Sequence, residues 1–160
     1  MLIEQAQVEE ADEILKLQKL AYQSEAEIYD DYTIRPLTES IGEIEAEFEN
    51  QVFLKASVDD RRIIGSVRAY MRQGTCFIGR LIVHPDFQNQ GIGTLLMQEI
   101  ERRFGEAKRF ELFTGYLSKR NIYLYEKLGY QIFKREKISE NLELVYMEKN
   151  NETIPQDGAS

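Results

Sequence analysis

The segment from Gly79 to Phe104 constrains this chain more than any other, because it predicts a strand, a loop and a helix in direct succession. The apolar run Leu81–Val83 stops before Pro85, which has no N–H to donate within a sheet and so marks the end of a strand. Apolar residues then recur at helical spacing from Ile92 to Phe104. The segment therefore predicts a strand-to-helix unit in the middle of the chain.

The loop of this unit, residues 88–93, carries glycines at its fourth and sixth positions, Gly91 and Gly93. Without a Cβ atom at these positions, a ligand can approach the backbone, and the first turn of a helix presents unpaired, partially positive N–H groups. This combination is typical of a phosphate site. The loop lacks both the Lys-Ser/Thr pair of triphosphate loops and the three-glycine pattern of dinucleotide folds. A tight turn without a ligand is the alternative that the loop alone leaves open.

A second stretch, residues 118–133, has an Asn followed four residues later by a Tyr, and then a Gly-aromatic pair, at Asn121, Tyr125 and Gly129-Tyr130. Together with the Gln-x-x-Gly-x-Gly loop, it resembles the two signatures of the GCN5-related N-acetyltransferase (GNAT) superfamily, in the same order. The resemblance spans most of residues 1–149. It implies an acyltransferase that uses acetyl-coenzyme A, and leaves the acceptor open.

The implied architecture is a mixed α/β (α+β) GNAT fold, with a central, twisted, mostly antiparallel sheet of about seven strands and about four helices. The sequence pattern predicts strands at residues 2–7, 52–58, 63–71, 75–83, 110–114, 130–138 and 142–148. It predicts helices from residue 9 to between 24 and 29, from a Thr38 cap to about 48, over 92–104 and over 121–127, with extended chain at Ile34–Leu37. Residues 1–149 form one expected domain, and the polar residues 150–160 an expected disordered tail.

The resemblance also implies which residues hold the cofactor. The pantetheine arm would pair with the backbone of the strand end at Leu81, Ile82 and Val83. The pyrophosphate would lie on the amides of Gln88, Asn89, Gln90, Gly91, Ile92, Gly93 and Thr94. Asn121 and Tyr125 would contact the cofactor, with Tyr125 as the general acid that protonates the departing thiolate. From the residues alone, Asn121 also suits a helix N-cap, and Tyr125 also suits half-buried packing.

No residue stands out as the general base. Glu111, in the strand after the central helix, and His84, after the cofactor strand, are the two side-chain candidates. Each also has an ordinary reading, Glu111 as a strand residue facing either side and His84 as an exposed turn residue. An ordered chain of water molecules is the alternative to both.

The acceptor site is expected near the first helices. Glu39, Glu43 and Glu47 recur every four residues, which predicts an acidic helix face, and Tyr29 and Tyr32 add aromatic rings that suit a cation. These residues point to a small cationic amine as acceptor. A solvated helix face is the alternative for the glutamates.

The charge balance, 20 basic against 28 acidic residues and a net charge of −8, disfavours nucleic acid and anionic membranes as partners. A single cysteine excludes a Cys-based metal cluster, and we expect no metal. The sequence shows neither a signal peptide nor a long apolar run, so we expect a cytoplasmic protein. The prediction is an acetyl-coenzyme A-dependent N-acetyltransferase of a small-molecule amine. Its alternatives are a non-catalytic coenzyme A sensor or a protein (Lys or N-terminal) acetyltransferase. The sequence leaves open whether the protein forms a homodimer.

Overall fold

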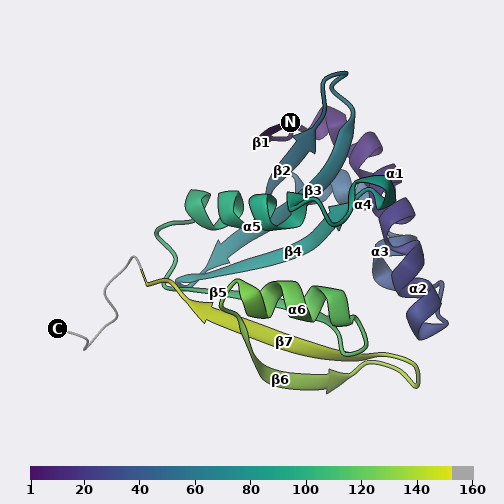
Figure 1. Ribbon diagram of the computed structural model, residues 1–160. Coiled ribbons are helices and arrows are strands. Elements are labelled where there is room, and N and C mark those ends of the chain that lie inside the picture. The colour runs from purple at the N-terminus through teal and green to yellow at the C-terminus, as the bar shows by residue number, and fades with distance from the viewer. Residues whose placement is uncertain (153–160) are drawn as a thin grey trace.

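In the computed structural model, which describes residues 1–152, seven strands join into one sheet in the order β1-β2-β3-β4-β5-β7-β6 (Figure 1). The strands are β1 (Leu2–Gln5), β2 (Val52–Ser57), β3 (Ile63–Arg72), β4 (Thr75–Val83), β5 (Arg109–Gly115), β6 (Gln131–Lys137) and β7 (Glu143–Asn150). The helices are α1 (Ala11–Ala21), α2 (Gln23–Tyr29), α3 (Arg35–Thr38), α4 (Ile41–Glu47), α5 (Ile92–Arg103) and α6 (Lys119–Lys127), with 3-10 turns η1 (Val8–Glu10) and η2 (Pro85–Phe87). All neighbouring strands are antiparallel except the parallel pair β4 and β5. The predicted fold class is confirmed.

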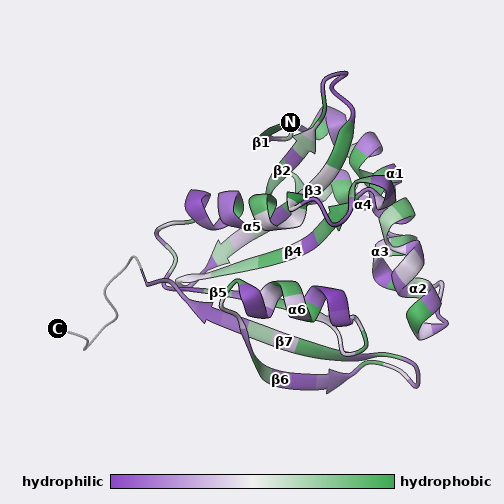
Figure 2. Ribbon diagram, in the orientation of Figure 1, coloured by the Kyte–Doolittle hydropathy of each residue, from purple (hydrophilic) through white to green (hydrophobic). Residues whose placement is uncertain are grey.

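Helices cover both faces of the sheet, because side chains alternate between the faces along each strand. On β4, Ile82 packs with the buried residues of α1 and α4, whereas Leu81 and Val83 pack with those of α5. Figure 2 shows hydrophobic residues in the central strands and both hydrophobic and hydrophilic residues along α5. No helix within residues 1–152 is long and apolar enough to cross a membrane.

The helices before β2 differ from the prediction. The first predicted helix is divided at Tyr22 into α1 and α2. The stretch expected to be extended contains the short helix α3, because Pro36 sits in the first turn, where its missing N–H would have had no partner in any case. The next helix is capped by Ser40 instead of Thr38: the Ser40 hydroxyl accepts from the Glu43 amide while the Glu43 carboxylate accepts from the Ser40 amide.

The end of the fold also differs in detail. Helix α6 begins at Lys119 after Ser118, so Asn121 lies in its first turn and is not the N-cap that its residue type suggests. Strand β7 continues through Asn150, and the buried Asn151 side chain donates to the carbonyls of Gly105 and Ala107. The fold therefore extends into the first residues of the predicted tail, whose remainder, 153–160, lies outside the described residues.

The central strands diverge. β4 and β5 pair at only three positions, where Thr75–Phe77 lie opposite Arg109–Glu111. Beyond them, the register of β4 with β3 shifts at a bulge around Arg80, whose backbone is left-handed (φ 50°). A bulge bends its strand, so the end of β4 is left with a free edge on the side facing β5. In Figure 1 this part of β4 passes between α5 and α6.

Candidate functional site

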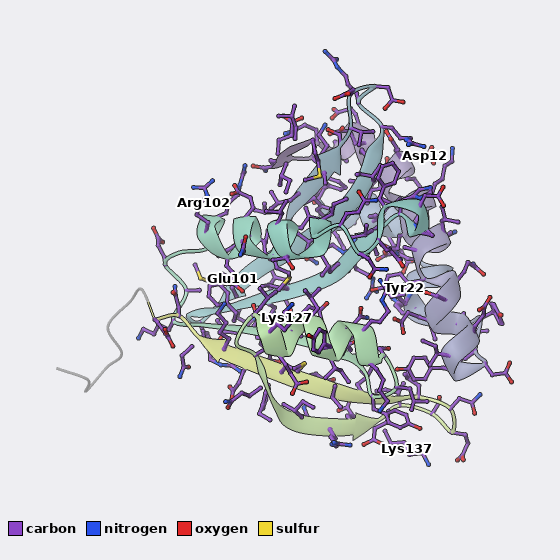
Figure 3. All side chains as sticks on the ribbon, in the orientation of Figure 1. Asp12, Tyr22, Glu101, Arg102, Lys127 and Lys137 are labelled. Atoms are coloured by element: carbon purple, nitrogen blue, oxygen red, sulfur yellow. The ribbon has the colours of Figure 1, made fainter. Side chains whose placement is uncertain are left out.

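A cleft of about 660 Å³ opens where β4 and β5 diverge. Its lining comes from the end of α1 and the start of α2, the end of β4, the loop before α5, the first turn of α5, and α6 with the residues before it. Figure 3 labels Tyr22 on the α1–α2 side of this region and Lys127 on the α6 side. The divergence of two neighbouring strands thus places elements far apart in the sequence around one space.

The strand end Leu81–Val83, which the sequence predicted to hold the pantetheine arm, forms part of the cleft wall. Ile82 is buried, while Leu81 and Val83 are half-buried. Gln88 follows η2 and donates from its side-chain amide to the Val83 carbonyl over 3.4 Å. The loop is therefore tied back onto the strand end that it follows.

The loop and the first turn of α5 present backbone amides to this cleft. Gly91 is the N-cap residue of α5, with φ 80°, and a Cβ atom there would meet no atom within 4 Å. Within residues 1–152, none of the amides from residue 88 to residue 94 donates to another backbone group, as expected for a helix N-terminus. All but one of the seven predicted loop residues line the cleft, the exception being the exposed Gln90.

Gly93 sits at the base of this cradle. A Cβ atom at this position would lie 3.4 Å from Leu124 and 3.7 Å from Leu81, within ordinary contact distance of both. Leu124 belongs to α6 and Leu81 to β4, so the absence of a side chain at Gly93 keeps open the space where α5, α6 and β4 meet. Any larger side chain would fill that space.

Helix α6 adds positive charge to the cleft through Lys119, Arg120 and Lys127. The Arg120 guanidinium donates to the side-chain oxygen of Gln88 at 2.7 Å and to that of Asn89 at 3.3 Å. These basic residues were missed in the sequence. The three residues recur along α6 together with the other residues of this helix that line the cleft. This helical spacing was the sequence signal that would have identified them.

Tyr125, the predicted acid, is 7% exposed and belongs to the hydrophobic core, with Leu124 rather than Tyr125 among the residues that line the cleft. Burial raises the pKa of its phenol, and the nearby Tyr22 and Glu25 raise that pKa further by charge repulsion. Both of these residues line the cleft. The Tyr125 hydroxyl is therefore protonated at neutral pH and is electrostatically coupled to the α1–α2 side of the site.

Asn121 and Glu25 face one another across the cleft. The Asn121 side-chain amide donates to Glu25 Oε1 at 3.2 Å and to Thr114 Oγ1 at 3.3 Å. Ser118, buried just before α6, donates to Glu25 Oε2 at 2.5 Å. The sequence identified Asn121, whereas Glu25, Ser118 and Tyr22 carry no motif and were missed.

The structure puts the two base candidates elsewhere. Glu111 forms an ion pair with Arg109 at 3.0 Å on β5 and does not line the cleft. His84 accepts a hydrogen bond at Nδ1 from the Asp86 amide and caps η2. Both side chains thus have structural partners outside the cleft lining.

The predicted acceptor residues are not brought together. Tyr29 is buried, and its hydroxyl bonds with the Ser118 hydroxyl at 2.7 Å, while Tyr32 is 54% exposed. Glu39 is fully buried in an ion pair with Arg68, because α4 begins only after Ser40 and leaves Glu39 outside the helix. Glu43 pairs with Arg35 on the surface. The expected acidic helix face is therefore not formed, and none of the four lines the cleft.

The chain is similar in sequence to a known protein family and to a curated protein. A family model described as the acetyltransferase (GNAT) family matches residues 11–130. UPF0157 protein YqkA of Bacillus subtilis (strain 168) is 30% identical over 132 residues, which are 82% of this chain and 38% of that protein. The chain thus spans little more than a third of the length of this curated relative.

Two solved structures are similar in fold. The structure of smu.2055 from Streptococcus mutans UA159 has a TM-score of 0.81 and 17% identity, covering 95% of this chain and 100% of that one. A GNAT superfamily phosphinothricin acetyltransferase from Sinorhizobium meliloti, in complex with AcCoA, has a TM-score of 0.76 and 16% identity, covering 93% of this chain and 87% of that one. At these identities the similarity concerns the fold alone.

Proposed function

The chain belongs to the GNAT acetyltransferase family, and from this premise we propose that it transfers the acetyl group of acetyl-coenzyme A to a primary amine in the cleft between β4 and β5. The acceptor that we propose is a small molecule. The residues that carry the proposal lie on the loop before α5, on the end of β4 and on α6.

The single observation that carries this proposal is the row of amides from residue 88 to residue 94, which have no backbone partner within residues 1–152 and whose residues, Gln90 excepted, line the cleft. Amides at a helix N-terminus carry partial positive charge and suit a phosphate group. Gly91 leaves open space where a Cβ would stand, so a diphosphate can approach the backbone there. The residues present therefore fit the diphosphate of coenzyme A.

Two further features support the same ligand. The free edge of β4 at Leu81–Val83 suits an extended pantetheine arm, which can pair with a strand as another strand would. Lys119, Arg120 and Lys127 add positive charge to the cleft of a chain whose net charge is −8. A local excess of positive charge attracts a phosphate-bearing ligand to this cleft rather than to the rest of the surface.

The chemistry requires an acyl donor, an amine and a proton for the leaving group. Acetyl-coenzyme A would supply the thioester, whose C–S bond breaks as the amine nitrogen forms the new C–N bond. Tyr125 lies directly behind the cleft wall, next to the lining residue Leu124, and holds its proton on Oη because burial raises its pKa, so its proposed role is to donate a proton to the leaving sulfur and not to act as a base. Removal of the ammonium proton is assigned to water in the open cleft, since neither Glu111 nor His84 lines it.

The test is calorimetric titration with acetyl-coenzyme A, followed by measurement of coenzyme A release with amines, aminoglycosides, amino acids and peptides. We expect roughly micromolar binding, and release with small amines. The matched variants are Gly93→Val, whose methyl groups fill the cradle beside Leu124, and Gly79→Val, whose Cβ meets no atom within 4 Å. Binding should be lost only in the first.

Each outcome has one meaning. Binding without release with any amine would identify a coenzyme A sensor, and release with peptides alone would identify a protein acetyltransferase. The absence of any heat from the folded protein would overturn the proposal.

A further inference from the structure

We propose that the carboxylate of Glu25 is the counter-ion for the acceptor's ammonium group, and that the acceptor is a primary amine with one positive charge and an apolar body. This inference rests on the proposed acetyl transfer for its chemical setting. It is carried by the hydrogen bonds, the charge and the lining of the cleft at its α1–α2 end.

Within residues 1–152, Glu25 and Asp31 are the half-buried carboxylates without a basic partner, and of these two only Glu25 lines the cleft. Glu39 pairs with Arg68, and Glu101 with Lys149. Within residues 1–152, the hydrogen-bond partners of Glu25 are the neutral Ser118 and Asn121, and no Lys or Arg forms an ion pair with it. A carboxylate lining a cleft without a cation is a site for one.

The hydrogen-bond directions around Glu25 are fixed by counting protons. The Leu117 amide donates to the Tyr29 hydroxyl at 2.9 Å, and Ser118 uses its only hydroxyl proton to donate to Glu25. The 2.7 Å bond between the hydroxyls of Tyr29 and Ser118 must therefore run from Tyr29 to Ser118. The chain of donors from Leu117 through Tyr29 and Ser118 therefore ends on Oε2 of Glu25.

The same series of hydrogen bonds fixes the position of the Glu25 carboxylate. Tyr29 reaches Ser118 only because Gly115 has no side chain: a Cβ atom there would lie 1.9 Å from the Tyr29 hydroxyl oxygen. Tyr29 is 4% exposed and does not line the cleft, so it positions Glu25 through Ser118, which is 2% exposed and belongs to the cleft lining. Each oxygen of Glu25 takes one of these protein donors, which leaves lone pairs on both for an ammonium group.

The surroundings select the amine. At this end of the cleft, the polar lining residues Ser24, Ser118 and Asn121 are joined by Ala21, Tyr22, Ile28 and Leu117, and this second group suits a hydrocarbon or aromatic body. Glu25 is the one acidic residue among the described lining residues, while α6 contributes three basic ones. A polyamine would therefore leave further ammonium groups without a counter-ion and near positive charge. A monoamine with an apolar body matches both features.

The experiment titrates 2-phenylethylamine and spermidine into the protein by calorimetry, with and without coenzyme A, and then measures their acetylation. We expect 2-phenylethylamine to bind and to be acetylated in preference to spermidine. Glu25→Gln should weaken its binding and raise its KM about tenfold or more, and leave coenzyme A binding unchanged. The matched control is Glu27→Gln, which removes an exposed charge from the same helix and should change neither.

Glu25→Asp retains the charge but withdraws it by one methylene, so it should fall between wild type and Glu25→Gln, and circular dichroism confirms that each variant is folded. Amine binding that is unaffected by Glu25→Gln, absence of amine binding, or preference for spermidine would each overturn the acceptor assignment. If amine binding depends on Glu25 but coenzyme A does not bind, the proposed acetyl transfer fails and the amine site stands.

Discussion

The guanidinium of Arg120 lies 2.7 Å from the side-chain oxygen of Gln88, and through it α6 holds the loop that precedes α5. The side-chain amide of Gln88 in turn donates to the Val83 carbonyl and so joins the loop to the end of β4. The contact joins the two stretches that carry the sequence signatures of the family. It also brings a permanent positive charge beside the amides that we propose to hold the diphosphate.

Arg120→Ala should weaken acetyl-coenzyme A binding about tenfold, the size expected when one charge-assisted contact is lost. The variant should also show a smaller loss of affinity on addition of salt, since less positive charge remains in the cleft. Calorimetry at low and high ionic strength measures both effects. Arg135→Ala, which removes an exposed charge from β6, is the control and should bind as wild type does. Equal weakening in the two variants would contradict the assignment.

Gly91→Ala should lower the free energy of unfolding by about 1 kcal/mol and the Tm by about 2–4 °C. The physical reason is backbone strain, since Gly91 has a φ of 80° that a residue with a Cβ atom rarely adopts. A steric clash is not the reason, because a Cβ atom there meets no neighbour within 4 Å. Gly79→Ala is matched, since its Cβ also meets nothing within 4 Å but its φ is not in the left-handed region. Thermal unfolding should separate the two variants, and an equal Tm would contradict strain at Gly91.

The sequence predicted the strands and the loop well, because their signals are local. Thr75–Val83 forms β4 at its predicted residues, ended by the proline that also opens η2. The loop before α5 follows from two glycines and a helical period that begins at Ile92. In both cases, backbone chemistry within a few residues decides the structure.

The side of the cleft that we propose for the acceptor was not predictable in the same way, because it depends on contacts across the fold. Glu25 is held in place by a hydrogen bond from Ser118, which lies 93 residues away in the sequence. Glu39 is buried by its pairing with Arg68, which no helical period reveals. The bulge at Arg80 places a residue other than glycine in the left-handed region, and Gly79 before it was the only local sign of an irregular strand.

Tyr125→Phe should lower kcat about tenfold or more and leave the Kd for acetyl-coenzyme A nearly unchanged, if the phenol donates to the leaving sulfur. Because burial and then the charges of Tyr22 and Glu25 raise the pKa of Tyr125, the phenol stays protonated as the pH rises toward 10. The rate with an alkylamine should therefore keep rising from pH 7 to about 10, as more of the amine loses its proton. A fall in rate near pH 9 that disappears in the variant would contradict the raised pKa of Tyr125, and a kcat that Tyr125→Phe leaves unchanged would contradict its role as the acid.

Glu39→Gln should lower the free energy of unfolding by about 3 kcal/mol at pH 7, because it leaves the buried Arg68 guanidinium without its closest carboxylate. Burial opposes ionisation of Glu39, but hydrogen bonds from Gln18 and Arg68, each at 2.9 Å, outweigh it and lower the pKa of this carboxyl below its usual 4.5. A lowered pKa means that the stabilisation is present above pH 4.5 and is lost as the pH falls through the folded-state pKa.

The difference in unfolding free energy between wild type and Glu39→Gln should therefore be largest near pH 7 and should shrink as the pH falls below 4.5, measured by denaturant unfolding. Glu43→Gln is the control, because its ion pair with Arg35 at 2.8 Å lies at the surface and should contribute less than about 1 kcal/mol. A difference for Glu39→Gln that stays constant with pH would mean that packing of the side chain, and not its charge, stabilises the contact between α3, α4 and β3.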